Sequence, residues 1–329
     1  MANKITGVIV GAGFMGKEHL ECSLRNENIS IIGVVDKNRD TGMELSAQAN
    51  CPWYADLEKL YAHVTPDYVD ICLPSSLHKD CAVYAMEHGS HVLVEKPFAV
   101  CLEDIDAMIA VAKKHSKRIM VAHVCRFMPQ YRFLHEAVIE KKYGSPISLT
   151  FFRESSTPNW SWNNWLHDKK ISGGTIMDLS IHDIDLANWL LGIPHSFYVT
   201  EAVSSGRAGV SEILSVLHYD NNVCAKITAN HLMPLGYPLT AGYKFVFEQG
   251  AVEWNTCNTK PDCIAVFTDE LKTDINIKEY YPEMDAVGYF EEISVFAQSL
   301  INNTPFPISV EDARLAVETV LNLNKSIDI

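Results

Sequence analysis

The sequence lacks long hydrophobic runs, an excess of basic residues and closely paired cysteines, and each absence excludes a class of protein. Its apolar stretches are shorter than the roughly 20 residues that a membrane-spanning helix needs. Lys and Arg number 27 against 41 Asp and Glu, which gives a formal net charge of −14 at pH 7. Nucleic acids and anionic membranes attract basic patches, so neither is expected as a partner.

Cysteine pairs are missing as well, because none of the nine cysteines forms a CxxC motif. Most lie inside apolar runs, where cysteine behaves as a small hydrophobic residue, as at Cys72, Cys81, Cys125 and Cys224. Reduced thiols in a cytoplasmic protein are therefore expected, with neither a disulfide framework nor a metal site. The N-terminal apolar run is short and lacks the cleavage site of a signal peptide, and no internal repeat is evident.

Strand and helix patterns alternate through the first 123 residues. Apolar runs typical of strands buried on both faces occupy residues 4–10, 31–35, 68–73, 91–94 and 118–123. Helical patterns lie between them, as at residues 79–88 and 103–115. This alternation predicts an α/β fold with a parallel, doubly wound sheet and a ligand crevice at the carboxyl ends of the strands. We expect a dinucleotide-binding Rossmann domain over residues 1–122.

A glycine motif directly follows the first strand. Gly11, Gly13 and Gly16 form GxGxxG, with Phe14 and Met15 between the last two glycines, and a helical segment comes next. The motif alone is a weak signal, but its place between a strand and a helix is the context of a dinucleotide fingerprint. Gly11 would permit the tight turn, Gly13 the approach of a pyrophosphate to the helix N-terminus, and Gly16 close packing of helix on strand.

An acidic residue ends the second strand, twenty residues after Gly16. The Asp36 carboxylate would accept hydrogen bonds from the adenosine ribose and would repel a 2′-phosphate, which favours NAD over NADP. Lys37 and Arg39 follow closely and soften that repulsion. The preference for NAD is therefore a moderate one.

Two further loops at strand ends carry polar groups. Pro74, Ser75 and His78 belong to the loop after residues 68–73, and Glu95 and Lys96 follow the next strand. At the carboxyl end of a parallel strand, a side chain can lean into the ligand crevice. A single lysine at such a position is more often a solvated surface charge, so Lys96 is a weak signal by itself.

The pattern changes after residue 123. Strand patterns, several of them alternating, occupy residues 147–153, 197–204, 213–219, 223–231, 243–248 and 263–268, and helical patterns end the chain at 285–302 and 310–327. Short turns between consecutive strands indicate a large, open and mostly antiparallel sheet with one face covered. We expect residues 123–329 to form an α/β domain for substrate binding and oligomerisation, whose last helix packs back on the first domain.

Residues 173–192 predict a helix that carries a polar stripe. Asp178, His182, Asp185 and Trp189 follow one another at intervals of four, three and four, so they share one helix face. Apolar residues flank the stripe on both sides, which predicts that it is buried. A histidine with two carboxylates suits proton transfer, although a core helix with hydrogen-bonded polar groups is the alternative. Other histidines, among them His19, His63, His115, His135 and His218, show no partnering pattern and are expected to be ordinary.

Residues 159–168 read NWSWNNWLHD, with three tryptophans among polar amides. Aromatic faces beside amides suit a pocket for a polyol ring, which makes Trp160, Trp162 and Asn163 candidate substrate contacts. Packing of the loop at the seam between the domains is an equal alternative.

Several motifs together resemble the Gfo/Idh/MocA oxidoreductases, the family of glucose–fructose oxidoreductase and inositol dehydrogenase. The matching stretches are GAGFMG, PSSLH at 74–78, VLVEKP at 92–97, RFMP at 126–129 and SGGTIMDLSIHDID at 172–185. They occur in the family's order and with similar spacing. The resemblance implies a nucleotide domain followed by an α/β domain whose sheet serves homodimer or homotetramer contacts.

The resemblance also implies site residues. It gives catalytic roles to Lys96, Asp178 and His182 and places Arg126 in a motif that binds the cofactor, while Trp165 matches a recurrent tryptophan near the substrate. A neutral His182 suits removal of a hydroxyl proton near pH 7. Lys96 can stabilise developing alkoxide charge, and Asp178 can orient the substrate or the histidine. Asp185 is expected to anchor the helix.

The sequence departs from the family pattern at Leu166, which replaces an arginine that often follows the tryptophan, so substrates of such members do not transfer directly. The leading hypothesis is an NAD-dependent dehydrogenase that oxidises a secondary hydroxyl of a cyclic, inositol-like polyol or a sugar, or reduces the ketone. One alternative is an enzyme that retains NAD and uses transient oxidation for sugar elimination or glycoside cleavage. Another is a non-catalytic sensor of NAD.

Overall fold

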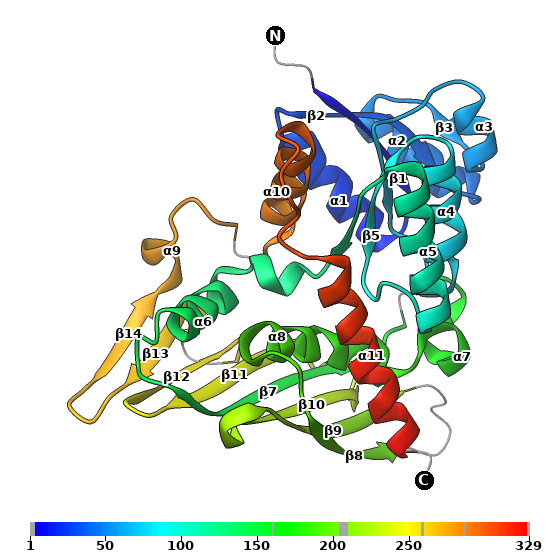
Figure 1. Ribbon diagram of the computed structural model, residues 1–329. Helices are drawn as coiled ribbons and strands as arrows, with labels where there is room; N and C mark the ends of the chain where they lie inside the picture. The colour runs from blue at the N-terminus through cyan, green and yellow to red at the C-terminus, as the bar shows by residue number, and fades with distance from the viewer. Residues whose placement is uncertain (1–3, 160, 204–209, 258–259, 286, 328–329) are drawn as a thin grey trace. The chain divides into compact units, whose positions relative to one another are not determined.

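The computed structural model describes residues 4–159, 161–203, 210–257, 260–285 and 287–327, which form two compact units (Figure 1). The first unit comprises the residues up to Val124 together with Tyr289–Arg314, and the second comprises Cys125–Gly288 and the residues from Leu315 onward. The change of pattern after residue 123 predicts one domain over residues 123–329. The chain instead returns to the first unit after Gly288.

The first unit is built on a six-stranded parallel sheet in the order β3-β2-β1-β4-β5-β6. Its strands are β1 (Ile5–Val10), β2 (Ile29–Val35), β3 (Trp53–Tyr54), β4 (Tyr68–Ile71), β5 (His91–Glu95) and β6 (Ile119–Ala122). All residues of β4 and β6 are buried, as expected of strands covered on both faces. The doubly wound α/β prediction is confirmed.

Helices connect these strands. They are α1 (Phe14–Arg25), α2 (Arg39–Ala49), α3 (Leu57–Tyr61), the short 3₁₀ turn η1 (Ser75–Leu77), α4 (His78–Glu87), α5 (Leu102–His115) and, from the returning segment, α10 (Tyr289–Ile301). The amide of Asn26 donates to Ser294 Oγ at 2.9 Å, and the Arg25 guanidinium lies 4.5 Å from the centre of the Phe290 ring. These contacts between α1 and α10 explain why the returning segment belongs to the first unit.

The second unit contains an eight-stranded sheet in the order β14-β13-β12-β11-β7-β10-β9-β8. Its strands are β7 (Pro146–Ser156), β8 (Ser196–Val203), β9 (Ser211–His218), β10 (Cys224–Met233), β11 (Thr240–Phe247), β12 (Gly250–Asn255), β13 (Cys263–Phe267) and β14 (Lys272–Asn276). Neighbouring strands are antiparallel except β7 and β10, which are parallel. The mostly antiparallel prediction is therefore confirmed, although it missed β12 and the polar edge strand β14.

Helices cover one face of this sheet. The second unit contains η2 (Val124–Phe127) from Cys125 on, α6 (Pro129–Ile139), η3 (Trp162–His167), α7 (Lys169–Ser172), the π-helical turn η4 (Ile176–Ser180), α8 (Ile181–Leu191), η5 (Asp220–Asn222), α9 (Ile277–Tyr280) and the later part of α11 (Val310–Ile327). Figure 1 shows α6 and α8 on the same side of the sheet, and α8 packs on β7 and β10. In the described part of the chain, no helix is both long and apolar enough to cross a membrane.

Candidate functional site

The glycine turn of the first unit has the geometry that a bound dinucleotide requires. Gly11 has φ +103°, and a Cβ there would lie 2.4 Å from the carbonyl oxygen of Cys72. A Cβ on Gly16 would lie 1.9 Å from the carbonyl oxygen of Gly11, so strand and helix approach as closely as glycine allows. At Gly13, by contrast, a Cβ would meet nothing within 4 Å. The open side of the turn thus lies at Gly13, where a pyrophosphate needs to approach.

The first turn of α1 suits an anion. Gly13 caps the helix without a side-chain hydrogen bond, and the first turn contains no acidic residue, so no side chain of this turn competes with an anion for its backbone N–H groups. Phe14 is 59% exposed, and the sulfur of Met15 lies 3.9 Å from the hydroxyl of Tyr289. The residues present therefore fit a dinucleotide.

Asp36 borders the same turn. One carboxylate oxygen accepts from the backbone N–H of Ala12 at 2.6 Å, and the other accepts from the N–H of Asn38 at 2.7 Å. These bonds fix the carboxylate, which is partly exposed, beside the glycine turn, while Lys37 is exposed. A fixed carboxylate here suits the hydroxyls of an adenosine ribose and disfavours a 2′-phosphate.

His78 joins the two remaining loops at this edge of the sheet. Its Nδ1 lies 2.9 Å from the carbonyl oxygen of Pro97, and its Nε2 lies 2.9 Å from that of Leu73. Burial lowers the pKa of His78, so the ring is neutral and donates to one of these carbonyls at a time. Pro74 caps η1, Ser75 is buried, and Lys96 is partly exposed. His78 therefore fixes the loops that carry these residues.

His19 is not the ordinary histidine that the sequence suggested. Its fully buried ring lies with Nδ1 at 3.0 and 2.9 Å from the two oxygens of Asp70 and with Nε2 at 3.0 Å from Oε1 of Glu95. Asp70 belongs to β4 and Glu95 ends β5, so α1 is joined to two neighbouring strands. The other oxygen of Glu95 accepts from the backbone N–H of Lys96 at 3.0 Å.

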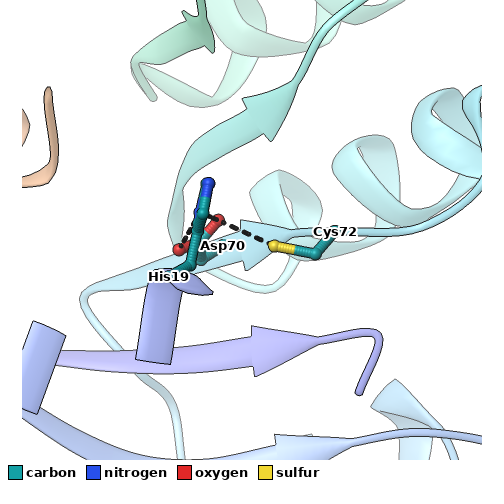
Figure 2. Close-up of side chains that lie close together, drawn as sticks. All are labelled: His19, Asp70 and Cys72. Atoms are coloured by element: carbon teal, nitrogen blue, oxygen red, sulfur yellow. Dashed lines mark hydrogen bonds and ion pairs between the residues drawn. The ribbon is translucent and has the colours of Figure 1, made fainter. Parts of the chain in front are cut away.

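Cys72 lies beside this network (Figure 2). Atoms of His19, Asp70 and Cys72 fall within 4.8 Å of one another, a spacing that a metal ion can bridge. Burial raises the pKa of the Cys72 thiol to about 12. The direct bonds between His19 and Asp70 account for the arrangement without a metal.

In the second unit, the helix with the polar stripe begins later than expected. Gly173 and Gly174 have φ of +79° and +78°, and Gly173 ends α7. The helix then starts with η4, a π-helical turn of the kind often found at functional sites. Asp178 lies on this turn, and Gly192 ends the helix as predicted.

The stripe itself is less buried than predicted. Asp178, His182 and Trp189 are partly exposed, whereas most other residues of η4 and α8 are buried. The prediction was wrong because it treated an almost wholly apolar circumference as a sign of complete burial. A partly exposed acid and histidine on a buried helix are accessible to a small molecule.

Each residue of the stripe has a partner in the second unit. Asp178 lies 3.8 Å from Nε2 of His231 on β10, and Nδ1 of His182 lies 3.7 Å from the sulfur of Cys125. Thr175 lies between strand and helix, with its hydroxyl 3.4 Å from Nδ1 of His231. Neither His231 nor the contact made by Cys125 is predicted by the sequence pattern.

The far end of the stripe is structural. Nε and Nη2 of Arg126 donate to the two oxygens of Asp185 at 2.8 and 2.7 Å, and both side chains are almost fully buried. His135 stacks on Trp189 with the ring centres 3.8 Å apart. Asp185 thus anchors the helix, as its position suggested, and it holds Arg126.

A second buried ion pair was also missed. Arg153 of β7 donates to both oxygens of Asp183, at 3.3 and 2.8 Å, and to the hydroxyl of Tyr131. Burial would lower the pKa of Arg153, but the adjacent Asp183 raises it well above its ordinary value, while burial raises the pKa of Asp183. The pair fixes α8 on the sheet. In the sequence, the only signal of this ion pair is that Arg153 and Asp183 are charged residues within apolar segments.

The tryptophan-rich segment forms η3. Trp165 is partly exposed, Trp162 is 68% exposed, and Asn163 and Asn164 have left-handed backbone conformations. Trp160 lies outside the described residues. The segment presents aromatic and amide groups at the surface of the second unit.

Family models match most of the chain. A model described as "Oxidoreductase family, NAD-binding Rossmann fold" matches residues 5–123, and one described as "GFO/IDH/MocA C-terminal domain" matches residues 131–253. The two matches cover the first sheet and the greater part of the second.

Individual relatives agree with this assignment. An inositol 2-dehydrogenase of Rhizobium meliloti is 25% identical over 94% of this chain and 92% of its own length. A UDP-N-acetylglucosamine 3-dehydrogenase of Acidithiobacillus ferrooxidans is 32% identical, over 58% of this chain and 56% of its own. Among solved structures, the WlbA dehydrogenase of Bordetella pertussis, in complex with NADH and UDP-GlcNAcA, has the same fold, with a TM-score of 0.88, 20% identity and coverage of 99% and 96% of the two chains.

Proposed function

Because the chain belongs to the Gfo/Idh/MocA oxidoreductase family and is an NAD-dependent dehydrogenase, we propose that it transfers hydride between NAD and a secondary hydroxyl of a cyclic polyol or sugar. The observation that carries the proposal is the pair Asp178 and His182, partly exposed on a helix that is mostly buried and held by ion pairs. These ion pairs fix the position of the helix, and a site for proton transfer needs groups held in place.

Three side chains carry the proposed chemistry. His182 removes the hydroxyl proton through Nε2, because its Nδ1 faces the sulfur of Cys125. Asp178, supported by His231, accepts a hydrogen bond from the substrate and orients it. Lys96 donates to the reacting oxygen and stabilises the negative charge that develops there as the hydride leaves. NAD supplies the nicotinamide ring that accepts the hydride.

The first unit supplies the cofactor contacts in this proposal except Arg126, which belongs to the second unit. Gly11, Gly13 and Gly16, with Phe14 and Met15, form the pyrophosphate turn, and the other contacts come from Asp36, Lys37, Pro74, Ser75, His78, Glu95, Lys96 and Arg126. Of these, His78 acts by fixing two loops, and Arg126 acts from a position held by Asp185. We assign nucleotide binding to residues 1–122 and substrate binding to the part of the chain that follows.

The proposal that the substrate is a polyol or a sugar is supported by the relatives and by the residues of η3. Inositol and the sugar of UDP-N-acetylglucosamine, for which two relatives are named, are rings with several hydroxyls. Trp165 and Asn163, with Trp160 beside them in the sequence, would stack on the C–H face of such a ring and bond its hydroxyls.

We also propose that a second copy of the chain covers the open face of the second sheet, giving a homodimer or a homotetramer. Tyr198 and Leu214 of neighbouring strands are 61% and 39% exposed there. Light scattering of the wild type and of a Tyr198→Glu/Leu214→Glu variant checks this, since a charged face would give monomers.

The function is tested by following NADH absorbance with NAD and NADP against inositols, aldoses and sugar acids. Net NADH accumulation with at least one polyol or sugar supports the proposal. Turnover without accumulation points to an enzyme that returns the hydride within each cycle.

Variants then test the residues. Lys96→Ala and His182→Ala should each lower kcat by about 100-fold or more. Lys79→Ala and His88→Ala, at a surface ion pair and a surface helix end, are the matched controls and should retain activity. Full activity in the Lys96 and His182 variants would show that the catalytic assignment is wrong.

A further inference from the structure

The buried imidazole of His19 is bonded at both nitrogens to carboxylates. Nδ1 faces Asp70 at 2.9 Å, and Nε2 faces Glu95 at 3.0 Å. Ionised carboxylates only accept hydrogen bonds, so both ring nitrogens must carry a proton and the ring is an imidazolium. Burial by itself would lower the pKa of His19, but Asp70 beside it raises it well above the ordinary value.

Glu95 is held in turn by this ring. Burial would raise the pKa of Glu95, but the hydrogen bond and charge of His19, and then the charge of Lys96, lower it below the ordinary value. The carboxylate therefore stays ionised. One oxygen accepts from the His19 ring, and the other accepts from the backbone N–H of Lys96.

The charges within this group are balanced. Two positive groups, the imidazolium and the Lys96 ammonium, offset the two carboxylates of Asp70 and Glu95, and the Cys72 thiol stays neutral because burial raises its pKa. Loss of the imidazolium would leave two buried carboxylates without their main partner. Glu95 would then be free to turn toward Lys96.

We propose that His19 is a positioning residue for Lys96: through its bond to Glu95 it fixes the backbone and the charged environment from which the lysine reaches the reacting oxygen. The inference rests on the catalytic role proposed for Lys96. His19 lies in α1 and is fully buried, so it acts through Glu95 and does not contact the substrate.

Two substitutions of His19 test the two hydrogen bonds of its ring one at a time. The side-chain amide nitrogen of glutamine lies at a distance from the backbone similar to that of histidine Nε2, and that of asparagine corresponds to Nδ1. His19→Gln therefore keeps a donor toward Glu95, and His19→Asn keeps one toward Asp70. Both variants lose the charge and one bond, so they form a matched pair.

We expect kcat of His19→Gln to stay within about threefold of wild type and that of His19→Asn to fall about tenfold or more, because small displacements of a catalytic group are costly. The affinity for NADH, measured by fluorescence, should be equal in the two variants, and so should the melting temperature. Equal kcat in the two variants would overturn the inference and leave the proposed function standing. Absence of turnover by the wild type would overturn both.

A second measurement depends neither on activity nor on folding of the two His19 variants. Nitrogen-15 spectra of the histidine rings in the wild-type protein report protonation of each ring nitrogen. Asp70→Asn, which leaves the bond to Glu95 intact, assigns the His19 signal by its shift. Both nitrogens of His19 should be protonated at pH 8. A neutral ring at that pH would contradict the inference, because one of the two carboxylates would then have no donor from His19.

Discussion

Arg126 and Asp185 form a buried ion pair in which two guanidinium nitrogens donate to the two carboxylate oxygens, at 2.8 and 2.7 Å. The pair joins η2 to α8, one turn beyond His182. Removing either partner leaves a buried charge without compensation, which costs more than the pair contributes when intact.

Asp185→Asn is therefore expected to lower the free energy of unfolding by about 3 kcal/mol, measured in urea. Glu253→Gln is the control, because its partner Lys244 is 59% exposed and such a pair contributes at most about 1 kcal/mol. Equal stability of the two variants would contradict a structural role for the Arg126 pair.

Substitutions at two glycines of the turn should have different effects, on protein stability at Gly16 and on cofactor binding at Gly13. Gly16→Ala places a Cβ against the backbone carbonyl of Gly11 and should destabilise the first unit. Gly13→Ala meets open space, so its melting temperature without cofactor should stay near that of the wild type while the affinity for NADH falls about tenfold or more. Fluorescence titration and thermal unfolding check both; unchanged affinity in Gly13→Ala would place the pyrophosphate elsewhere.

Asp36 should determine the choice of cofactor. Asp36→Asn removes the negative charge and keeps an acceptor for one of the two backbone N–H groups, of Ala12 and of Asn38, that the carboxylate binds. The ratio of kcat/KM for NAD to that for NADP should fall about tenfold or more, because the repulsion of a 2′-phosphate is lost. Asp40→Asn, exposed in the first turn of α2, is the control and should leave the ratio unchanged.

His231 should matter for substrate and not for cofactor. His231→Leu removes the partner of Asp178, and kcat/KM for the polyol is expected to fall about tenfold while the affinity for NADH is unchanged. His195→Leu, an exposed position in the same unit, should have little effect on either quantity. A parallel loss of NADH affinity in His231→Leu would indicate general damage to the protein.

His19 should make stability depend on pH. Its pKa is raised in the folded protein, so folding takes up a proton above the unfolded value of 6.5. Its contribution is complete below that pH and is lost as the pH rises toward the folded pKa. Between pH 6.5 and 8.5, the unfolding free energy of the wild type should fall relative to His19→Asn, by about 1.4 kcal/mol per pH unit at the upper end. A constant difference would contradict the raised pKa.

The sequence predicts well those features of the fold and the site that are formed by residues close together in the chain. The strand, glycine turn, helix and Asp36 follow one another within about thirty residues, and their chemistry is fixed by φ angles and close approach. The polar stripe was equally visible, because helical periodicity places Asp178 and His182 on one face. The exposure of this stripe could not be predicted from the sequence, because burial depends on the other elements that pack beside the helix.

Contacts that depend on strand order were missed. His19 is separated from Asp70 by 51 residues and from Glu95 by 76, and only the order β1-β4-β5 brings them together. The strand β14 has the sequence KTDIN and pairs at an edge, so it lacks the apolar pattern used to find strands. The return of α10 to the first unit likewise depends on tertiary contacts with α1.

The parallel pairing of β7 and β10 places the whole of residues 157–223 inside one crossover connection. The start of this connection is tied to the end of β10, because the hydroxyl of Thr157 donates to the carbonyl oxygen of His231 at 3.0 Å. Both ends are thus held by the centre of the sheet, and α8 is held between them by Arg153. The stretch between β7 and α7 leaves and returns near fixed positions, so exchanging this loop between relatives is an experiment that tests whether it determines the substrate.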